Sequence, residues 1–249
     1  MSQKIIIITG GSRGIGAATA QLAASQGYAV AISYLHNRAA ADAIVAAIES
    51  SGGRALAVAS DVAQEADIER LFETVDKAWG PLTALVNNAG ILEQQTRVED
   101  ITAARLNRIF TTNVTGSFLC AREAIRRMST RRGGAGGAIV NISSAAARLG
   151  AAGEFVDYAA SKGAIDSLTI GLSKEVADEG IRVNAVRPGI IYTDIHASGG
   201  EPGRVDRIKD GVPMKRGGHA SEVAEAIMWL LSDQSSYTTG GFIDVTGGR

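Results

Sequence analysis

The residues best suited to acid–base chemistry are Tyr158 and Lys162, which stand four positions apart in the segment Tyr158-Ala159-Ala160-Ser161-Lys162. On an α-helix this spacing puts both side chains on one face and close together. A tyrosine hydroxyl titrates at about pH 10, and a neighbouring ammonium group favours its phenolate. We therefore expect a lowered pKa for Tyr158 and proton exchange between its hydroxyl and a carbonyl or alcohol oxygen. The alternative is a tyrosine that only packs in a core.

A glycine-rich turn, Thr9-Gly10-Gly11-Ser12-Arg13-Gly14-Ile15-Gly16, follows the first apolar run and opens a helical pattern. Glycines allow positive φ angles and a close approach of backbone to phosphate, and a helix N-terminus offers free N–H groups. The expected phosphate contacts are Gly10, Ser12, Arg13, Gly14, Ile15 and Gly16. A plain tight turn is the alternative.

The same turn matches the Gly-x-Ser-x-Gly pattern of α/β-hydrolases, with Ser12 as the nucleophile. In those enzymes several strands precede the turn, whereas here it follows the first strand. The three histidines, His36, His196 and His219, are expected to be surface or loop residues. We therefore favour phosphate binding over hydrolase chemistry.

Short apolar runs, predicted to be buried strands, alternate with amphipathic helical patterns. The runs are Ile5–Ile8, Ala29–Tyr34, Ala55–Ala59, Leu82–Val86, Ala138–Ile142, Ile181–Val186 and Phe242–Val245. Helical spacing starts, for example, at Ile68 and Ile165, and Ser221 is the expected N-cap of the last helix. This alternation predicts a single α/β domain over residues 1–249. Its fold is a Rossmann-type, doubly wound, seven-stranded parallel sheet with helices on both faces and ligands at the carboxyl ends of the strands.

Composition and charge favour a soluble globular protein. Of 249 residues, 45% are hydrophobic and 20% charged, and the net charge of −1 gives no attraction to nucleic acid or to anionic membranes. With a single cysteine, Cys120, the chain can form neither a disulfide framework nor a cysteine-based zinc site. Cys120 has apolar neighbours and is expected in the core. No targeting segment and no membrane span are evident. We expect a cytoplasmic protein without a metal.

Further polar motifs stand where predicted strands end. Asn87-Asn88-Ala89-Gly90 follows the fourth strand and Ser143-Ser144 the fifth. With the glycine-rich turn, the Tyr158–Lys162 segment and Thr246-Gly247-Gly248, this order of motifs resembles the short-chain dehydrogenase/reductase family over residues 4–248. The resemblance is greatest to its 3-oxoacyl-carrier-protein-reductase-like members and sugar dehydrogenases. It implies reversible hydride transfer between a nicotinamide cofactor and a carbonyl or secondary alcohol.

The resemblance also implies four catalytic roles. Tyr158 is the general acid/base, and Ser144 hydrogen-bonds the reacting oxygen. Lys162 contacts the nicotinamide ribose, and Asn113 holds a water that links Lys162 to solvent. Ser144 precedes Tyr158 by fourteen residues, one more than is common in the family. We therefore expect the loop between them to be one residue longer.

The expected cofactor is NADP(H). Members that prefer NAD carry an acidic residue at the end of the second strand, where this chain has Ser33-Tyr34-Leu35-His36. Arg13 and Arg38 offer guanidinium groups for a 2′-phosphate, with Asn37 beside them. NAD(H) is the alternative, because Arg38 is also typical of a solvated helix start. The resemblance adds cofactor contacts from Asp61, Val62, Asn88, Ala89, Gly90, Tyr158, Lys162, Pro188, Gly189, Ile191 and Thr193.

The substrate region is expected between residues 91–95, 148–156 and 190–218, with 193–218 as a lid, since loops of this length often cover sites. Its polar candidates are Glu93, Gln94, Arg148, Glu154 and His196. They favour a small hydroxy or keto compound over a long acyl chain, unless these side chains only face solvent.

Two further functions stay open. The first is an NADPH-dependent 3-oxoacyl-carrier-protein reductase, which would dock its carrier protein through a basic run. This run comprises Arg126, Arg127, Arg131 and Arg132. Asp178-Glu179 speaks against this function, because it is acidic where such reductases tend to have a basic residue. A non-catalytic NADP(H)-binding redox sensor would not need four catalytic residues. As partners we expect a small carbonyl or alcohol substrate and further copies of the chain. The family usually forms tetramers, or dimers, through helices near 102–128 and 157–179 and the last strand.

Overall fold

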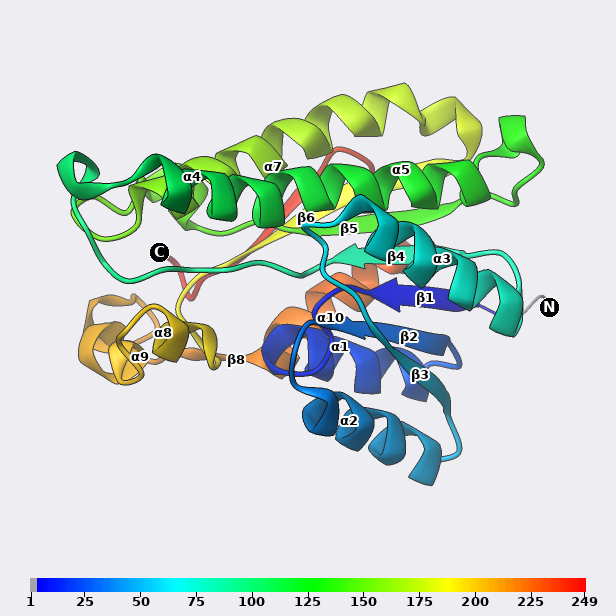
Figure 1. Ribbon diagram of the computed structural model, residues 1–249, viewed down its shortest axis with the longest axis horizontal. Helices are drawn as coiled ribbons and strands as arrows, with labels where there is room; N and C mark the ends of the chain where they lie inside the picture. The colour runs from blue at the N-terminus through cyan, green and yellow to red at the C-terminus, as the bar shows by residue number, and fades with distance from the viewer. Residues whose placement is uncertain (1–3) are drawn as a thin grey trace.

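The computed structural model describes residues 4–249, whose main element is a seven-stranded parallel sheet (Figure 1). The order across the sheet is β3-β2-β1-β4-β5-β6-β9. The strands are β1 (Ile5–Ile8), β2 (Ala29–Tyr34), β3 (Arg54–Ala59), β4 (Ala84–Asn87), β5 (Gly137–Ile142), β6 (Ile181–Pro188) and β9 (Phe242–Val245). All seven predicted runs are strands, and their ends lie within two residues of the predicted ones. The Rossmann-type fold is thereby confirmed.

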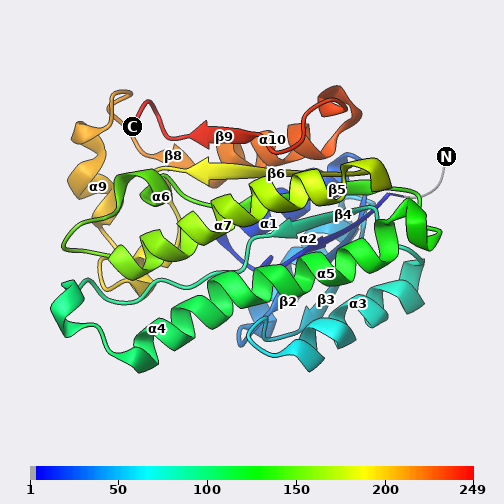
Figure 2. The same cartoon turned by 90° about the horizontal axis from the view of Figure 1, so that it is seen from above.

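Helices cover both faces of the sheet (Figures 1 and 2). One face is covered by α1 (Gly14–Ser25), α2 (Arg38–Ser50) and α10 (Ala220–Leu231), and the other by α3 (Glu65–Trp79), α5 (Gly116–Met128) and α7 (Val156–Glu175). The shorter helices are α4 (Ala103–Phe110), α6 (Ala146–Leu149), α8 (Ile195–Ser198) and α9 (Arg204–Ile208).

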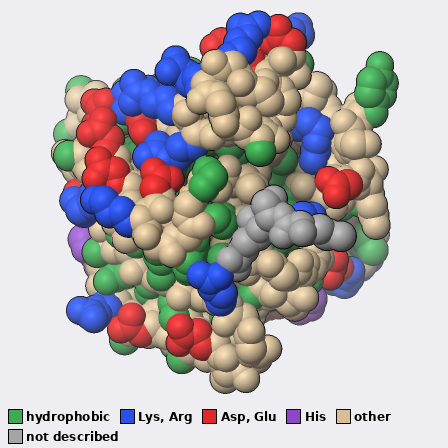
Figure 3. Space-filling model, turned by 90° about the vertical axis from the view of Figure 1, so that its right-hand side faces the viewer, with side chains coloured by type: hydrophobic (Ala, Val, Ile, Leu, Met, Phe, Trp, Pro, Cys, Tyr) green, Lys and Arg blue, Asp and Glu red, His purple; other side chains and the backbone are tan. Residues whose placement is uncertain are grey.

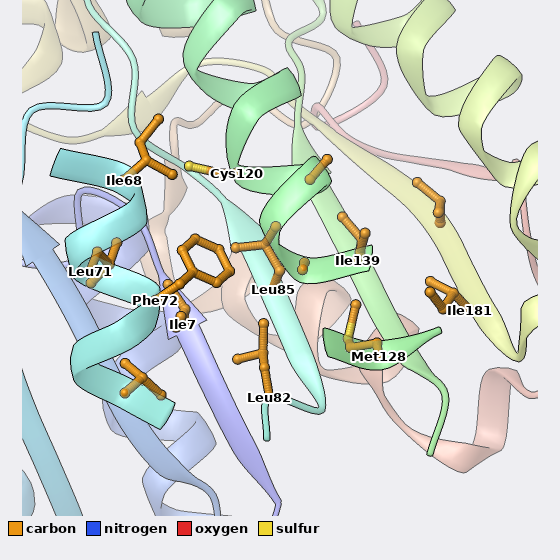
Figure 4. Close-up of a cluster of buried hydrophobic side chains, with 14 of the residues drawn as sticks. Ile7, Ile68, Leu71, Phe72, Leu82, Leu85, Cys120, Met128, Ile139 and Ile181 are labelled. Atoms are coloured by element: carbon orange, nitrogen blue, oxygen red, sulfur yellow. The ribbon is translucent and has the colours of Figure 1, made fainter. Parts of the chain in front are cut away.

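Each strand feeds two cores because successive side chains point to opposite faces. Ile5 and Ile7 of β1 belong to the core under α3, α5 and α7, whereas Ile6 and Ile8 belong to the core under α1, α2 and α10. Figure 4 shows the first of these cores, with Cys120 among the buried side chains. Cys120 is buried as predicted.

The start of α10 differs from the prediction. The helix begins at Ala220, and His219 rather than Ser221 holds the N-cap position. The carboxylate of Glu222 accepts a hydrogen bond from the His219 N–H over 2.8 Å. The prediction of Ser221 as the N-cap was wrong: the helix starts before Ser221, and the Glu222 side chain caps the free N–H of His219.

Residues 191–219 form a small unit beside the carboxyl ends of the strands (Figure 1). Two short strands, β7 (Ile191–Tyr192) and β8 (Gly218–His219), pair in parallel and bring the ends of this unit together. Helices α8 and α9 lie between them. Neither β7 nor β8 is among the predicted strands, since two-residue strands leave no periodic pattern in the sequence.

The opposite end of the molecule, where the strands begin, carries interspersed acidic and basic side chains (Figure 3). This mixture agrees with the net charge of −1. No helix within residues 4–249 is long and apolar enough to cross a membrane.

Candidate active site

A cavity of about 610 Å³ lies at the carboxyl ends of the strands, where the order reverses between β2-β1 and β4. Ligands bind at this point in open α/β sheets. Most predicted site residues line the cavity: Gly10, Ser12, Arg13, Gly14, Ile15, Asn37, Asp61, Val62, Asn88, Ala89, Gly90, Ser144, Tyr158, Lys162, Pro188, Gly189, Ile191 and Thr193. Gly16, Arg38 and Asn113 are not among the lining residues.

The glycine-rich turn ends where α1 begins. The N–H groups of Gly10 and Gly11 donate to the Ser33 hydroxyl and carbonyl oxygens over 3.1 and 2.9 Å, which leaves the N–H groups at the start of α1 for a ligand. Gly10 and Gly14 have φ angles of 63° and 54°, which side chains rarely adopt. The N-cap residue Arg13 makes no capping hydrogen bond, and the first turn of α1 contains no acidic residue. The first N–H groups of a helix have no partner within it, so this cradle fits the phosphates of a dinucleotide.

Gly16 has a packing role instead of lining the cavity. A Cβ atom at this position would lie 2.6 Å from Asn88 Nδ2 and 2.6 Å from the Gly10 carbonyl oxygen. The Asn88 amide needs this space, because it donates hydrogen bonds to the carbonyls of Thr9 and Gly10 over 2.8 and 3.0 Å. The end of β4 is thus tied to the phosphate turn.

Thr9 completes this tie, and sequence reasoning assigned it no role. Its hydroxyl oxygen accepts hydrogen bonds from the N–H groups of Asn88 and Ala89, each over 3.0 Å. The residue follows directly on β1 and is buried. A buried threonine at the end of a strand, beside a glycine turn, is a signal that could have pointed to this role.

Asn113 lies in the long helix expected for it, at a single π-helical turn (Thr111–Thr115) between α4 and α5. Such turns are rare and are often found at functional sites. Its amide is fully buried: Oδ1 accepts from the Ile91 N–H over 2.8 Å, and Nδ2 donates to the Ile91 carbonyl over 3.0 Å. A Cβ atom on Gly90 would lie 3.4 Å from Asn113 Oδ1 and 3.6 Å from Lys162 Nζ. The two side chains therefore flank Gly90.

Tyr158 and Lys162 lie together on α7, as predicted. Lys162 Nζ is 5.5 Å from the centre of the Tyr158 ring and donates a hydrogen bond to the Ile142 carbonyl over 2.7 Å. Burial lowers the pKa of Lys162 to about 8, although Asp166 opposes this fall. Burial raises the pKa of Tyr158 to about 12, against a hydrogen bond with the Ser144 side chain.

The expected lowering of the Tyr158 pKa was therefore wrong for the protein's own groups. Desolvation disfavours the phenolate more strongly than Ser144 favours it. Lys162 does not offset this rise, and the same burial lowers its own pKa to about 8.

The two serines after β5 have separate partners. Ser144 lines the cavity and hydrogen-bonds Tyr158, whereas Ser143 donates to Asp166 Oδ1 over 2.6 Å. Asp166 Oδ2 also forms an ion pair with Arg187 Nη2 over 2.8 Å. The spacing of fourteen residues thus still brings Ser144 to Tyr158, with α6 in the intervening loop.

A buried ion pair beside Tyr158 was not predicted. Arg105 Nε on α4 donates to Asp157 Oδ2 over 2.6 Å, and its Nη1 donates to the Gln94 carbonyl over 2.6 Å. Asp157 Oδ1 also accepts from the Tyr158 N–H over 2.9 Å. The partners are 52 residues apart, and no local pattern marks such a pair.

The end of β2 has no carboxylate at the cavity. Ser33, Tyr34, Leu35 and His36 line it there, together with Asn37, whose Oδ1 accepts from the Ala40 N–H over 2.9 Å. Arg13 lines the cavity, but Arg38 is 79% exposed and pairs with Asp42 over 3.3 Å.

Of the polar residues expected around the substrate, Glu154 and His196 line the cavity. Glu93 instead pairs with Arg108 over 2.8 Å, and Arg148 with Asp244 over 3.2 Å. Gln94 offers its carbonyl to Arg105. Arg204, which we did not predict, lines the cavity and pairs with Glu154.

The parallel sheet, the open N–H groups at α1 and the polar cluster around Tyr158 define a dinucleotide-binding oxidoreductase of the Rossmann type. Residues 10–249 match the family model described as "Enoyl-(Acyl carrier protein) reductase". The chain belongs to the short-chain dehydrogenase/reductase family, whose members are NAD(P)(H)-dependent oxidoreductases.

Relatives of known sequence and structure agree with this assignment. The chain is 60% identical over 245 residues to "Uncharacterized oxidoreductase YgfF" of Escherichia coli K12, covering 98% of this chain and 99% of that one. It is 35% identical over 249 residues to "Glucose 1-dehydrogenase 2" of Bacillus subtilis 168, covering 100% and 95%. A short-chain dehydrogenase of Burkholderia cenocepacia, solved in complex with NADP, superposes with a TM-score of 0.90 at 32% identity, covering 99% and 98%.

Proposed function

We propose that the protein catalyses NADP(H)-dependent, reversible hydride transfer between a carbonyl and a secondary alcohol. One observation carries this proposal: Ser144, Tyr158 and Lys162 line the same cavity as the phosphate turn. The nicotinamide ring supplies or accepts the hydride when it is bound. The protein's own groups then hold the reacting oxygen and exchange its proton.

Tyr158 is the proton donor in the reducing direction. A hydroxyl with a pKa of about 12 keeps its proton at neutral pH, so the proton is in place for a carbonyl oxygen. Ser144 hydrogen-bonds Tyr158 and can also donate to that oxygen as negative charge develops on it. Lys162, beside the ring, favours the phenolate left after transfer.

Asn113 has a positioning role in this proposal. Its amide holds the backbone of Ile91 through both polar atoms, beside the cavity wall at Gly90. Because π-helical turns are often found at functional sites, we assign to this one the water that links Lys162 to solvent.

The preference for NADP(H) rests on Arg13. The cavity at the end of β2 offers no carboxylate to a ribose 2′-hydroxyl, whereas the Arg13 guanidinium can pair with a 2′-phosphate. Arg38 can bind a 2′-phosphate only after it breaks its ion pair with Asp42, so we assign it a smaller part of the NADP(H) preference than Arg13. NAD(H) is the alternative cofactor, because Arg38 is solvated at the start of its helix.

Titration with NADPH and NADH, followed by fluorescence and thermal shift, tests this choice. We expect tighter binding of NADPH, and a loss of at least about tenfold in NADPH affinity for Arg13→Ala with little change for NADH. Arg97→Ala, at an exposed residue outside the cavity, is the control. Equal affinities for both cofactors in the unaltered protein would remove the case for a 2′-phosphate site.

The basic run that would dock a carrier protein is partly neutralised within the chain. Arg127 pairs with Asp76 and Glu123, and Arg131 pairs with Asp178 over 2.5 Å. Basic side chains that are neutralised within the chain give weak attraction to an acidic carrier. A small carbonyl or alcohol is therefore the proposed substrate.

The remaining expectations belong to the same proposal. Residues 1–249 act as one domain, and 193–218 act as the substrate lid. The chain forms a homo-oligomer, a dimer or a tetramer, through α5, α7 and the last strand, β9. Phe118 of α5 and Ile170 of α7 are 49% and 43% exposed. Exposed large apolar side chains on adjacent helices suit such an interface.

A further inference from the structure

The imidazole of His196 has one free acceptor. Its Nε2 lies 2.9 Å from the Ile191 carbonyl oxygen, which can only accept, so Nε2 carries the ring proton. Burial, helped by Arg204, lowers the pKa of His196 and keeps the ring neutral. The other nitrogen, Nδ1, is therefore a bare acceptor. It is buried and has no hydrogen-bond partner among residues 4–249.

An acceptor of this kind needs a donor from outside the chain. A buried polar group without a partner costs about 1–3 kcal/mol, which a ligand recovers when it supplies the missing hydrogen bond. His196 lines the same cavity as Tyr158. His196 belongs to α8, within the proposed lid.

The charges around His196 are already matched. Arg204 pairs with Glu154 and, over 3.1 Å, with Glu201, and its guanidinium lies 5.1 Å from the centre of the Phe155 ring. Arg204 is 8% exposed. Because these carboxylates are neutralised, a neutral donor fits this end of the cavity better than an ammonium group.

We propose that His196 determines substrate specificity by accepting, through Nδ1, a hydrogen bond from a hydroxyl group of the substrate. The substrate class is then a small carbonyl compound that carries a further hydroxyl, such as a hydroxyketone or a sugar. This inference rests on the proposed function and narrows its substrate.

Two substitutions separate the two nitrogens of the ring. His196→Gln can place its amide nitrogen where Nε2 lies and keep the hydrogen bond to Ile191, but it loses the acceptor at Nδ1. His196→Asn can place its amide oxygen where Nδ1 lies and keep the acceptor, but it loses the hydrogen bond to Ile191. If His196 has only a structural role, His196→Asn should be the impaired variant. If His196 determines specificity, His196→Gln should lose the preference for the hydroxylated substrate.

The kinetic test uses ketones with a hydroxyl, each paired with the analogue in which a methyl group replaces that hydroxyl. Hydroxyacetone and butanone are one such pair. We expect kcat/KM to favour the hydroxylated member by about tenfold in the unaltered enzyme and in His196→Asn, and the ratio to fall toward one in His196→Gln. A ratio that stays the same in His196→Gln overturns the proposal.

A spectroscopic test does not depend on turnover. Nitrogen NMR of the 15N-histidine protein, assigned with His196→Gln, reports each ring nitrogen of the three histidines. In Tyr158→Phe with cofactor and saturating hydroxyacetone, the His196 Nδ1 resonance should shift upfield while Nε2 stays. An unmoved Nδ1 overturns the inference, even if ketones are reduced. Failure to bind either cofactor would instead refute the proposed function.

Discussion

Replacement of Lys162 by Met is expected to stabilise the fold while it damages the site. Lys162 is 4% exposed, and burial lowers its pKa from 10.5 to about 8. One pH unit of difference in pKa corresponds to about 1.4 kcal/mol. Keeping the charged lysine buried therefore costs roughly 3 kcal/mol of folding free energy at neutral pH. Lys162→Met removes this cost, but it also loses the hydrogen bond to Ile142, which lowers the stability by about 1 kcal/mol.

The sign of the pH dependence follows from the lowered pKa. Between about pH 8 and pH 10 the unfolded chain holds the Lys162 proton and the folded chain does not. The stability of the unaltered protein therefore rises with pH across this window, relative to Lys162→Met. We expect the variant to be about 2 kcal/mol more stable at pH 7 and to lose this advantage near pH 10.

Urea unfolding at fixed protein concentration, from pH 7 to pH 10, measures the difference. Lys174→Met, at an exposed position of the same helix, is the matched control and should change stability little. A difference between Lys162→Met and the unaltered protein that stays constant with pH would refute the reasoning.

Three further predictions concern stability and reactivity. Asp157→Asn leaves the Arg105 guanidinium buried without its anion and should lower the free energy of unfolding by about 3–5 kcal/mol. The double variant Arg105→Met with Asp157→Leu should lose less stability. Urea titration measures both losses, and equal losses would contradict the prediction. Gly11→Ala puts a Cβ atom 2.5 Å from Ile32 Cγ2 and should cost about 1–3 kcal/mol, seen as a lower Tm in calorimetry; an unchanged Tm would show that the turn can shift. Cys120, buried with a pKa raised to about 12, should react with thiol reagents only after unfolding, and rapid labelling of the native protein would speak against its burial.

The sheet could be predicted because its strands are apolar on both faces. Runs such as Ile5–Ile8 supply side chains to two cores and cannot form amphipathic surfaces. The cavity residues could be predicted because glycine, asparagine, serine and tyrosine stand at strand ends or on the next helix, in an order that resembles a family.

Contacts between distant residues could not be predicted. Arg105 meets Asp157 only through the packing of α4 against α7, and the two short strands that close the 191–219 unit carry no pattern. The pKa of Tyr158 rises because burial outweighs its neighbours, and the degree of burial is a property of the fold. Arg38 illustrates the same limit, since its pairing with Asp42 on one helix competes with the cofactor role.

Turnover by Tyr158→Phe tests the central claim most directly. The variant keeps the ring but lacks the hydroxyl that donates the proton. With NADPH and any ketone that the unaltered enzyme reduces, we predict a loss of about 10³-fold or more in kcat/KM, with NADPH still bound in a fluorescence titration. If Tyr158→Phe reduces the ketone at a rate close to that of the unaltered enzyme, Tyr158 is not the proton donor and the proposed chemistry is wrong.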